Sequence, residues 1–183
     1  MNKLLIILLL TIPVTLIIWS KYVHAEDDNE LHQVIKHFGK VDVNLYRGGQ
    51  PDEHDLKLLK EFGIKKVINL RYEKDLIEAE RKQVEALGME YVNIPWTILS
   101  PYDQNIFDNF FEAIEDKESK PVFFHCKRGS ERTGVLASVY KIKVKGLGLD
   151  EALEDTKKYN VKFIWRPFVN SKIRTFYKKL HTK

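Results

Sequence analysis

One stretch of ten residues constrains this chain most, because it holds the only cysteine within a strand–loop–helix pattern. An apolar run at residues 121–124 predicts a buried strand, and residues 135–145 have the apolar spacing of a helix. Cys126 begins the loop between them, where backbone N–H groups and the helix dipole bind anions. A cysteine at this place is expected to have a lowered pKa and to be a thiolate. Arg132 can present a planar guanidinium to two oxygens of a phosphate. The stretch from His125 to Gly134 therefore predicts a nucleophile beneath a bound phosphate.

A lone cysteine after an apolar strand is usually a small buried side chain. Here a histidine precedes the cysteine, Gly129 follows three residues later, and Arg-Thr-Gly at 132–134 closes the loop. This combination is expected by chance roughly once in 10^5 positions or fewer at average residue usage. The pattern therefore favours catalysis over packing. With a single cysteine the chain forms no internal disulfide, so the thiol has no structural role of that kind.

Strand-type and helix-type segments alternate along the chain. The predicted strands are residues 41–46, 64–70, 89–94 and 121–125, and the predicted helices are residues 52–62, 74–87, 103–116, 133–145, 150–159 and 170–180. This alternation predicts an α/β fold, a three-layer sandwich with a mostly parallel central sheet flanked by helices. Ligands bind at the carboxyl ends of such strands, where Cys126 and Arg71 both lie.

The loop His125-Cys126-x5-Arg132-Thr133-Gly134 resembles the phosphate-binding loop of the protein tyrosine phosphatase superfamily, in its dual-specificity branch. Residues 45–51 (LYRGGQP) resemble the opening segment of the atypical dual-specificity phosphatases of bacteria, fungi and plants. Residues 66–71 (KVINLR) resemble the strand that follows it in them. The resemblance extends from about Val41 to Leu180 and implies a protein tyrosine phosphatase-like fold.

The resemblance also implies roles. Cys126 would be the nucleophile, and Arg132 would bind the transition state. The Thr133 hydroxyl would hydrogen-bond the thiolate, and His125 would hold the loop and tune the cysteine without acting as a base. Gly129, like Gly134, would permit close backbone approach to the phosphate. The phosphate-binding loop would comprise Lys127, Arg128, Gly129, Ser130, Glu131 and Arg132.

Further basic side chains are candidates for substrate contact. They are Lys127, Arg128, Arg47 and Arg71, although an arginine at a strand end is more often a salt-bridge partner. Glu131 partly cancels the charge of the two loop cations. The histidines outside the loop, among them His37, show no metal-ligand spacing and are predicted to be surface residues, so no metal or other cofactor is expected.

Hydrolysis also needs an acid to protonate the leaving oxygen, and the family supplies an aspartate from a loop ahead of the nucleophile. Residues 94–103 (IPWTILSPYD) hold no carboxylate before Asp103, which makes Asp103 the candidate general acid. Asp103 also precedes an apolar-periodic run, which is typical of a helix N-cap. The cap is the favoured interpretation.

The amino-terminal residues do not belong to the predicted fold. Residues 4–19 are largely apolar, Lys3 precedes them, and Val23-x-Ala25 fits a signal-peptide cleavage site. An uncleaved anchor stays an alternative, although the run is shorter than the ~20 residues that span a bilayer. We expect residues 1–25 to be a signal peptide or membrane anchor, residues 26–40 a lead-in segment and residues 41–183 the catalytic domain.

Lys3 before the apolar run and the acidic residues after it predict that the domain lies outside the cytoplasm. It would be periplasmic or secreted, or anchored to the cytoplasmic membrane facing outward, with membrane contact only through residues 4–19 if these are retained. Without residues 1–25 the chain keeps 28 basic and 26 acidic residues, a net charge of +2. This charge is too small to indicate a nucleic-acid partner.

The sequence therefore predicts a cysteine-dependent phosphomonoester hydrolase that forms a cysteinyl-phosphate intermediate. The favoured activity is that of a protein-tyrosine or dual-specificity phosphatase acting on phosphotyrosine in an exported or envelope protein. An inositol polyphosphate or phosphoinositide phosphatase is the alternative enzyme, because Lys127 and Arg128 add charge to the loop. A phosphate-binding pseudophosphatase is the alternative from another class, because the loop aspartate is missing.

Overall fold

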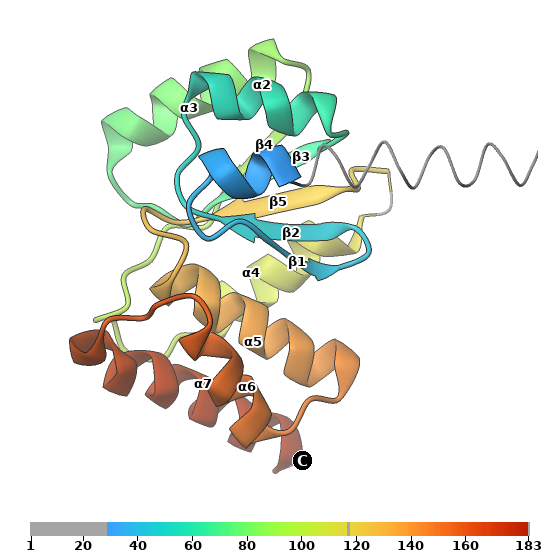
Figure 1. Cartoon of the computed structure of the whole chain (residues 1–183). Helices are drawn as coiled ribbons and strands as arrows, with labels where there is room; N and C mark the ends of the chain where they lie inside the picture. Colours follow the sequence, from blue (N-terminus) through green and yellow to red (C-terminus); the bar gives the residue numbers. More distant parts are fainter. Residues whose placement is uncertain (1–28, 117, 183) are drawn as a thin grey trace, which may run out of the picture.

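The computed structural model describes residues 29–116 and 118–182, which form a five-stranded sheet between two layers of helices (Figure 1). In spatial order the strands are β1 (Gly39–Asp42), β2 (Leu45–Gly48), β5 (Val122–His125), β3 (Lys66–Asn69) and β4 (Glu90–Asn93). β1 pairs with β2 in antiparallel orientation, and all other pairs are parallel. The predicted mostly parallel α/β sandwich is confirmed.

The register of the central strand brings three residues level at the carboxyl edge of the sheet. His125, the last residue of β5, lies opposite Gly48 of β2 and opposite Asn69 of β3. The segments that leave these three strands therefore start side by side, and Cys126 begins one of them.

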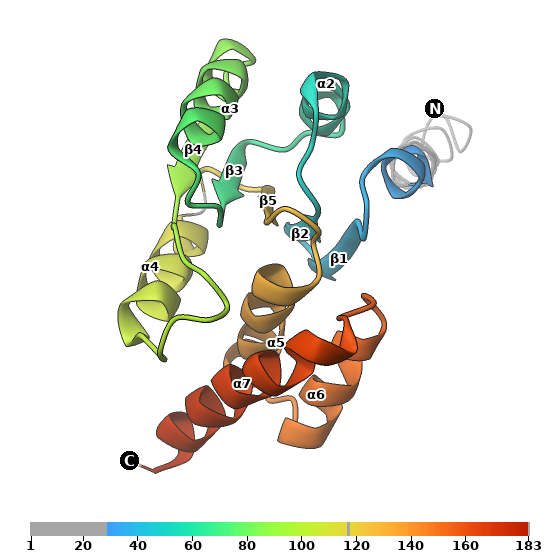
Figure 2. The same cartoon turned by 90° about the vertical axis from the view of Figure 1, so that its left-hand side faces the viewer.

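Helices cover both faces of the sheet (Figures 1 and 2). One layer contains a short helical segment at residues 29–34, α2 (Glu53–Glu61) and α3 (Lys74–Ala86). The other contains α4 (Gln104–Glu115), α5 (Glu131–Lys145), α6 (Leu149–Lys157), the 3-10 turn η1 (Phe163–Trp165) and α7 (Arg166–His181).

Side-chain alternation along the central strands fills a core on each face. Phe123 and Val67 pack into the core beneath α2 and α3, whereas Phe124 and Ile68 pack into the core that holds the inner faces of α4, α5 and α7. All four side chains are buried. A strand that is buried on both faces has a continuous apolar sequence. Residues 121–124 could therefore be identified as a buried strand from the sequence.

Several boundaries differ from the sequence prediction. The single strand predicted at residues 41–46 is instead the hairpin β1–β2, with a turn at residues 43 and 44 where the Asp42 carboxylate accepts a hydrogen bond from the Val43 N–H at 2.8 Å. Helix α7 begins at Arg166 and not at residue 170, since Pro167 fits the first turn of a helix.

The predicted signal peptide or anchor at residues 1–25 lies outside the described residues. The predicted lead-in segment is described from residue 29 onward, and its last two residues, Gly39 and Lys40, belong to β1. Across residues 29–116 and 118–182, no helix is long and apolar enough to span a membrane.

Candidate active site

Cys126 lies at the carboxyl edge of the sheet, between the end of β5 and the start of α5. We call residues 126–132 the phosphate loop. The cysteine is only 1% exposed and lines a cavity of about 210 Å³. The cavity is lined by Tyr72, Thr97, Ile98, Leu99, Cys126, Lys127, Arg128, Glu131, Arg132 and Trp165. The structure thus brings five residues of the predicted loop together around one cavity, with apolar and aromatic side chains as its walls.

The backbone of the phosphate loop is held from outside by hydrogen bonds to three consecutive carbonyl oxygens. The Gln50 N–H donates to the Lys127 carbonyl at 3.4 Å, Nδ1 of His37 to the Arg128 carbonyl at 2.7 Å, and Nη2 of Arg47 to the Gly129 carbonyl. In a planar trans peptide the N–H points opposite to the C=O of the same unit. Fixing these carbonyls outward therefore turns the N–H groups of residues 128–130 the other way, as an anion-binding loop requires.

Gly129 is required at its position for two separate reasons. Its φ of +74° is a left-handed conformation that side chains disfavour. A Cβ atom there would lie 2.6 Å from the carbonyl carbon of Gly48 and from the nitrogen of Gly49. Gly48 and Gly49 at the end of β2 and Gly129 of the loop thus permit direct backbone packing, whereas the sequence interpretation assigned Gly129 to close approach to the phosphate.

Arg47 does not line the cavity, contrary to the prediction that it is a candidate for substrate contact. Its side chain is buried beneath the loop, and its guanidinium lies 3.6 Å from the centre of the Tyr159 ring. Burial lowers the pKa of Arg47 to about 10, and negative charge on Tyr159 or Cys126 opposes this shift. The guanidinium is therefore still protonated at neutral pH and contributes fixed positive charge behind the nucleophile.

Arg132 projects from the first turn of α5 and is anchored by backbone oxygens. Its Nη1 donates to the Leu70 carbonyl at 2.9 Å and to the Trp96 carbonyl at 3.2 Å. The Tyr72 ring lies 5.7 Å from the guanidinium carbon. Because these two bonds hold Nη1 in place, the guanidinium is oriented before any ligand binds.

His125 is fully buried and faces a carboxylate that the sequence analysis did not identify. Its Nε2 lies 3.0 Å from Oε1 of Glu80 on α3, within ion-pair distance. The sequence carried a signal, because Glu80 lies on the same face of the predicted helix as Ile77 and Val84 and is buried with them. A carboxylate on the apolar face of a helix indicates a polar partner in the core.

Other polar groups complete the surroundings of Glu80. The donors to its carboxylate are Nε2 of Gln50 at 2.6 Å, the Tyr91 hydroxyl at 3.2 Å and Nδ2 of Asn69. Burial raises the pKa of Glu80, but the adjacent His125 and the donated hydrogen bonds lower it more, so the net pKa lies below its usual value. Glu80 is therefore a carboxylate at neutral pH.

The remaining loop residues have distinct environments. Glu131 is buried and accepts hydrogen bonds from Nη2 of Arg128 at 2.7 Å and from Nε at 3.3 Å, which confirms that it offsets a loop cation. Lys127 is exposed at the cavity rim. The Ser130 hydroxyl lies 3.1 Å from Nδ1 of His37. The Thr133 hydroxyl is buried and has no hydrogen-bond partner within the described part of the chain.

Arg71 is not among the residues that line the cavity. It is buried, and its guanidinium donates to the Glu73 carboxylate at 2.9 and 3.2 Å and to Oε1 of Gln50 at 3.1 Å. Arg71 thus has the salt-bridge partner that is usual for an arginine at a strand end. It connects the end of β3 to the polar network around Glu80.

Asp103 is exposed and caps α4. Its Oδ1 accepts hydrogen bonds from the backbone N–H and the side-chain amide of Asn105, both at 3.0 Å. It does not line the cavity, whose sole carboxylate among the described residues is that of Glu131. The favoured interpretation of Asp103 as a helix cap is confirmed.

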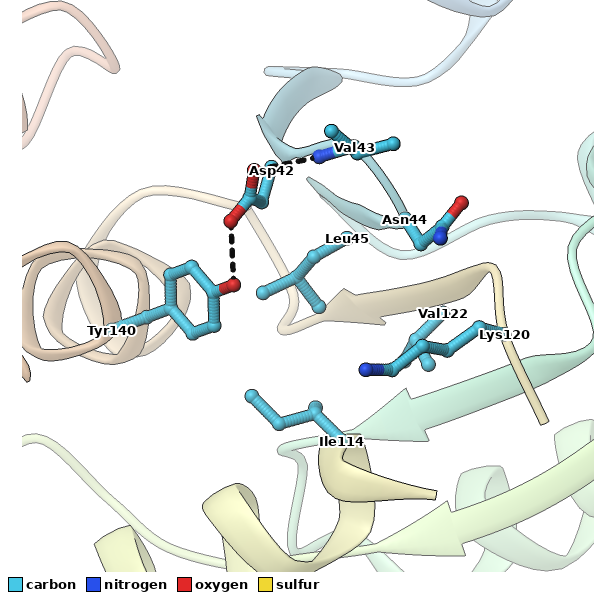
Figure 3. Close-up of a pocket in the computed structure, with 8 residues that line it drawn as sticks. All are labelled: Asp42, Val43, Asn44, Leu45, Ile114, Lys120, Val122 and Tyr140. Atoms are coloured by element: carbon cyan, nitrogen blue, oxygen red, sulfur yellow. Dashed lines mark hydrogen bonds between the residues drawn. The ribbon is translucent and has the colours of Figure 1, made fainter. Parts of the chain in front are cut away.

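A second cavity of about 240 Å³ lies at the opposite edge of the sheet, beside Leu45 and Val122, the first residues of β2 and β5 (Figure 3). Its main polar contact is the hydrogen bond from the Tyr140 hydroxyl to the Asp42 carboxylate at 2.6 Å. This bond, together with Lys145, lowers the pKa of Asp42 to about 2. Because the cavity holds no nucleophile, the site at Cys126 is the better candidate for catalysis. No cluster suited to hold a metal ion occurs within residues 29–116 and 118–182.

Comparisons with known proteins agree with this geometry. Residues 19–165 match the family model "DSP-PTPase phosphatase fused to NAD+ Kinase". The chain is 28% identical to inositol diphosphatase DSP3 of Arabidopsis thaliana, over 70% of this chain and 64% of the relative. It is 25% identical to the dual specificity protein phosphatase TpbA of Pseudomonas aeruginosa, over 65% of this chain and 52% of TpbA.

A structure of P. aeruginosa TpbA in complex with pTyr has the same fold. It superposes with a TM-score of 0.63 at 18% identity, and the match covers 83% of this chain and 99% of that one. The chain spans only about half to two thirds of the length of the two curated relatives. The family model covers most of the chain, including the whole phosphate loop. The chain therefore belongs to the DSP-PTPase family of cysteine-dependent phosphatases.

Proposed function

We propose that this protein hydrolyses phosphotyrosine in protein substrates through a cysteinyl-phosphate intermediate on Cys126. The observation that carries the proposal is the shape of the cavity, with a buried thiol at the phosphate loop and Tyr72, Ile98, Leu99 and Trp165 among its walls. An aromatic leaving group buries apolar surface against such walls. The pTyr bound to TpbA is consistent with this substrate.

The chemistry follows from the groups around the cavity. The Cys126 sulfur attacks phosphorus, the bond from phosphorus to the tyrosyl oxygen breaks and that oxygen takes up a proton, while the Arg132 guanidinium stabilises charge on the equatorial oxygens. Water then attacks the phosphocysteine and gives up a proton, which releases inorganic phosphate and the thiolate. The N–H groups of residues 128–130 bind the phosphate oxygens in both steps.

An inositol polyphosphate is the second candidate substrate. Lys127 and Arg128 line the cavity, and cations at this place bind additional phosphates. The name of the relative DSP3, an inositol diphosphatase, points the same way. Against it stands the ion pair between Arg128 and Glu131, which removes much of the charge that a polyanion requires.

The deciding experiment compares a phosphotyrosine peptide, a phosphothreonine peptide and inositol polyphosphates at equal concentration in one phosphate-release assay. We expect the phosphotyrosine peptide to have the highest kcat/KM. Preference for the inositol phosphates would replace the proposal with the second candidate. Tungstate binding without turnover of any substrate would identify a phosphate-binding pseudophosphatase.

Two variants provide the controls for this assay. Cys126→Ser is expected to abolish turnover and to retain tungstate binding, because a serine hydroxyl does not ionise near neutral pH. Arg132→Lys is expected to lose roughly 10²–10³-fold in kcat, as when one preorganised transition-state donor is removed. More than a tenth of wild-type turnover in Cys126→Ser would refute the cysteinyl-phosphate intermediate.

We further propose that the enzyme acts outside the cytoplasm, on exported or envelope proteins. The basic start, the apolar run at residues 4–19 and the Val23-x-Ala25 pattern support this location. Fractionation of cells that express the full chain tests it, with mass spectrometry to find whether the mature protein starts at Glu26. Recovery of the intact chain from the cytoplasm would refute it.

A further inference from the structure

His37 has a backbone conformation that a histidine rarely adopts. Its φ is +55°, in the left-handed region, where a residue with a Cβ atom is less stable by about 1–2 kcal/mol. The residue lies in the lead-in segment, between the helical segment 29–34 and β1. Such a conformation persists only where surrounding contacts hold it, and it often marks a functional position.

The contacts that hold His37 lie in the phosphate loop. Nδ1 of its ring is 2.7 Å from the Arg128 carbonyl oxygen and 3.1 Å from the Ser130 hydroxyl oxygen. A carbonyl oxygen only accepts hydrogen bonds, so Nδ1 carries the hydrogen. The donated bond exists whether the ring is neutral, as the Nδ1–H tautomer, or protonated on both nitrogens.

The segment around His37 is packed firmly against the same loop. Ile35 and Phe38 are buried in the core beneath α2 and α3. The Gly49 N–H donates to the Lys36 carbonyl at 2.7 Å, and a Cβ atom on Gly49 would lie only 3.1 Å from that oxygen. The lead-in segment is therefore fixed between Gly49, which directly follows β2, and the loop. His37, predicted to be a surface residue, is half-buried and hydrogen-bonded to the phosphate loop.

We propose that His37 is a positioning residue for the phosphatase reaction, acting through the peptide unit between Arg128 and Gly129. By holding the Arg128 carbonyl outward, His37 keeps the Gly129 N–H directed at the bound phosphate. Gly129 has no Cβ atom to restrict the rotation of this peptide, so the bond from His37 helps to fix it. The inference rests on the proposed phosphatase function of the same site.

Two substitutions, His37→Gly and His37→Asn, separate the effect of the donated bond from the effect of the backbone conformation. Glycine adopts the left-handed conformation freely but has no donor. Asparagine also tolerates it, and its Nδ2 is bonded to Cγ as Nδ1 of histidine is, so it can donate to the same carbonyl. The measurements are the dissociation constant of vanadate by calorimetry, and kcat and KM with para-nitrophenyl phosphate. His54→Asn, at an exposed position on α2, is the matched control.

We expect His37→Gly to weaken vanadate binding and to lower kcat, each about tenfold, the weight of one well-placed hydrogen bond. KM is expected to change less, since the N–H groups of the loop bind the phosphate most strongly in the transition state. In His37→Asn, vanadate affinity and kcat should stay within about threefold of wild type. His54→Asn should have the same values as wild type. Wild-type vanadate affinity in His37→Gly, or equal losses in the glycine and asparagine variants, would overturn the proposal. Vanadate binding is measured without turnover, so an inactive wild-type protein would refute the proposed function alone.

Discussion

The carboxylate of Glu80 lies 3.0 Å from Nε2 of His125, the residue that directly precedes the nucleophile. Glu80 belongs to α3 and His125 to β5, so this contact joins a helix on one face of the sheet to the start of the phosphate loop. Both side chains are buried. A buried charge that is paired and hydrogen-bonded fixes its neighbours in one arrangement, whereas the same charge left alone is strongly unfavourable.

Glu80→Gln should therefore destabilise the fold, in a way that depends on pH. The pKa of Glu80 is lowered in the folded protein, so its stabilisation is complete above the ordinary glutamate pKa of 4.5 and is lost as the pH falls through the lowered value. We expect Glu80→Gln to reduce the free energy of unfolding at pH 7 by about 1–3 kcal/mol. The difference from wild type should narrow as the pH falls below about 4.5.

Urea unfolding of both proteins across this pH range is the measurement. Glu78→Gln, at an exposed position on the same helix, is the control and should change stability little at any pH. A difference between wild type and Glu80→Gln that widens at low pH would contradict the assigned direction of the pKa shift.

Arg47 provides a second test of the groups behind the loop. Arg47→Lys should lose the stacking on Tyr159 and the bond to the Gly129 carbonyl, because an ammonium group has neither the planar surface nor the reach of guanidinium. We expect kcat with para-nitrophenyl phosphate to fall about tenfold or more, together with a lower Tm. Arg174→Lys, on the exposed side of α7, should leave both unchanged. Wild-type kcat in Arg47→Lys would show that the outward carbonyl of Gly129 needs no donor from Arg47.

The strand, the loop and the helix around Cys126 could be predicted because their signals are local. The apolar run, the glycine spacing and the helix pattern all lie within about twenty-five residues of sequence. The supports of the loop could not be predicted in the same way. His37, Arg47 and Gln50 reach it from about eighty to ninety residues away, and their roles depend on how β2 pairs with β5.

Arg47 and Arg71 show the same limit of prediction from sequence. The sequence identifies each as a cation near a strand end, but the direction of an arginine side chain is decided by the partners that surround it. Tyr159 of the segment after α6 and Glu73 before α3 supply those partners. Both arginines thus support the site from behind or beside it, and Arg132 is the arginine that reaches the cavity together with Arg128.

Glu131 should influence which substrates the cavity accepts. Its ion pair with Arg128 at 2.7 Å keeps that guanidinium from other anions. Glu131→Gln removes the negative charge and leaves Arg128 available to a second phosphate. We expect kcat/KM for inositol polyphosphates to rise relative to that for a phosphotyrosine peptide, as measured in one phosphate-release assay. An unchanged ratio of the two values would show that Arg128 takes no part in substrate choice.

The substitution Asp103→Asn tests whether the general acid comes from the segment before α4. Oδ1 of Asp103 already accepts two hydrogen bonds at the start of that helix, outside the cavity. If Asp103 only caps the helix, Asp103→Asn should cause small and equal losses of kcat with phosphotyrosine and with para-nitrophenyl phosphate, since asparagine caps nearly as well as aspartate. We expect this result.

The leaving groups make the comparison decisive. General acid catalysis is worth about 10²–10⁴-fold, and para-nitrophenol leaves readily without a proton, whereas tyrosine does not. If Asp103 protonated the leaving oxygen, Asp103→Asn would therefore lose activity chiefly with phosphotyrosine, and the assignment of Asp103 as a cap alone would be wrong. Thermal unfolding is a poor substitute for this test, because the Asn cap preserves stability under either role. Equal small losses would instead direct the search for the acid to Glu131, the carboxylate that the described residues place at the cavity, or to the substrate itself.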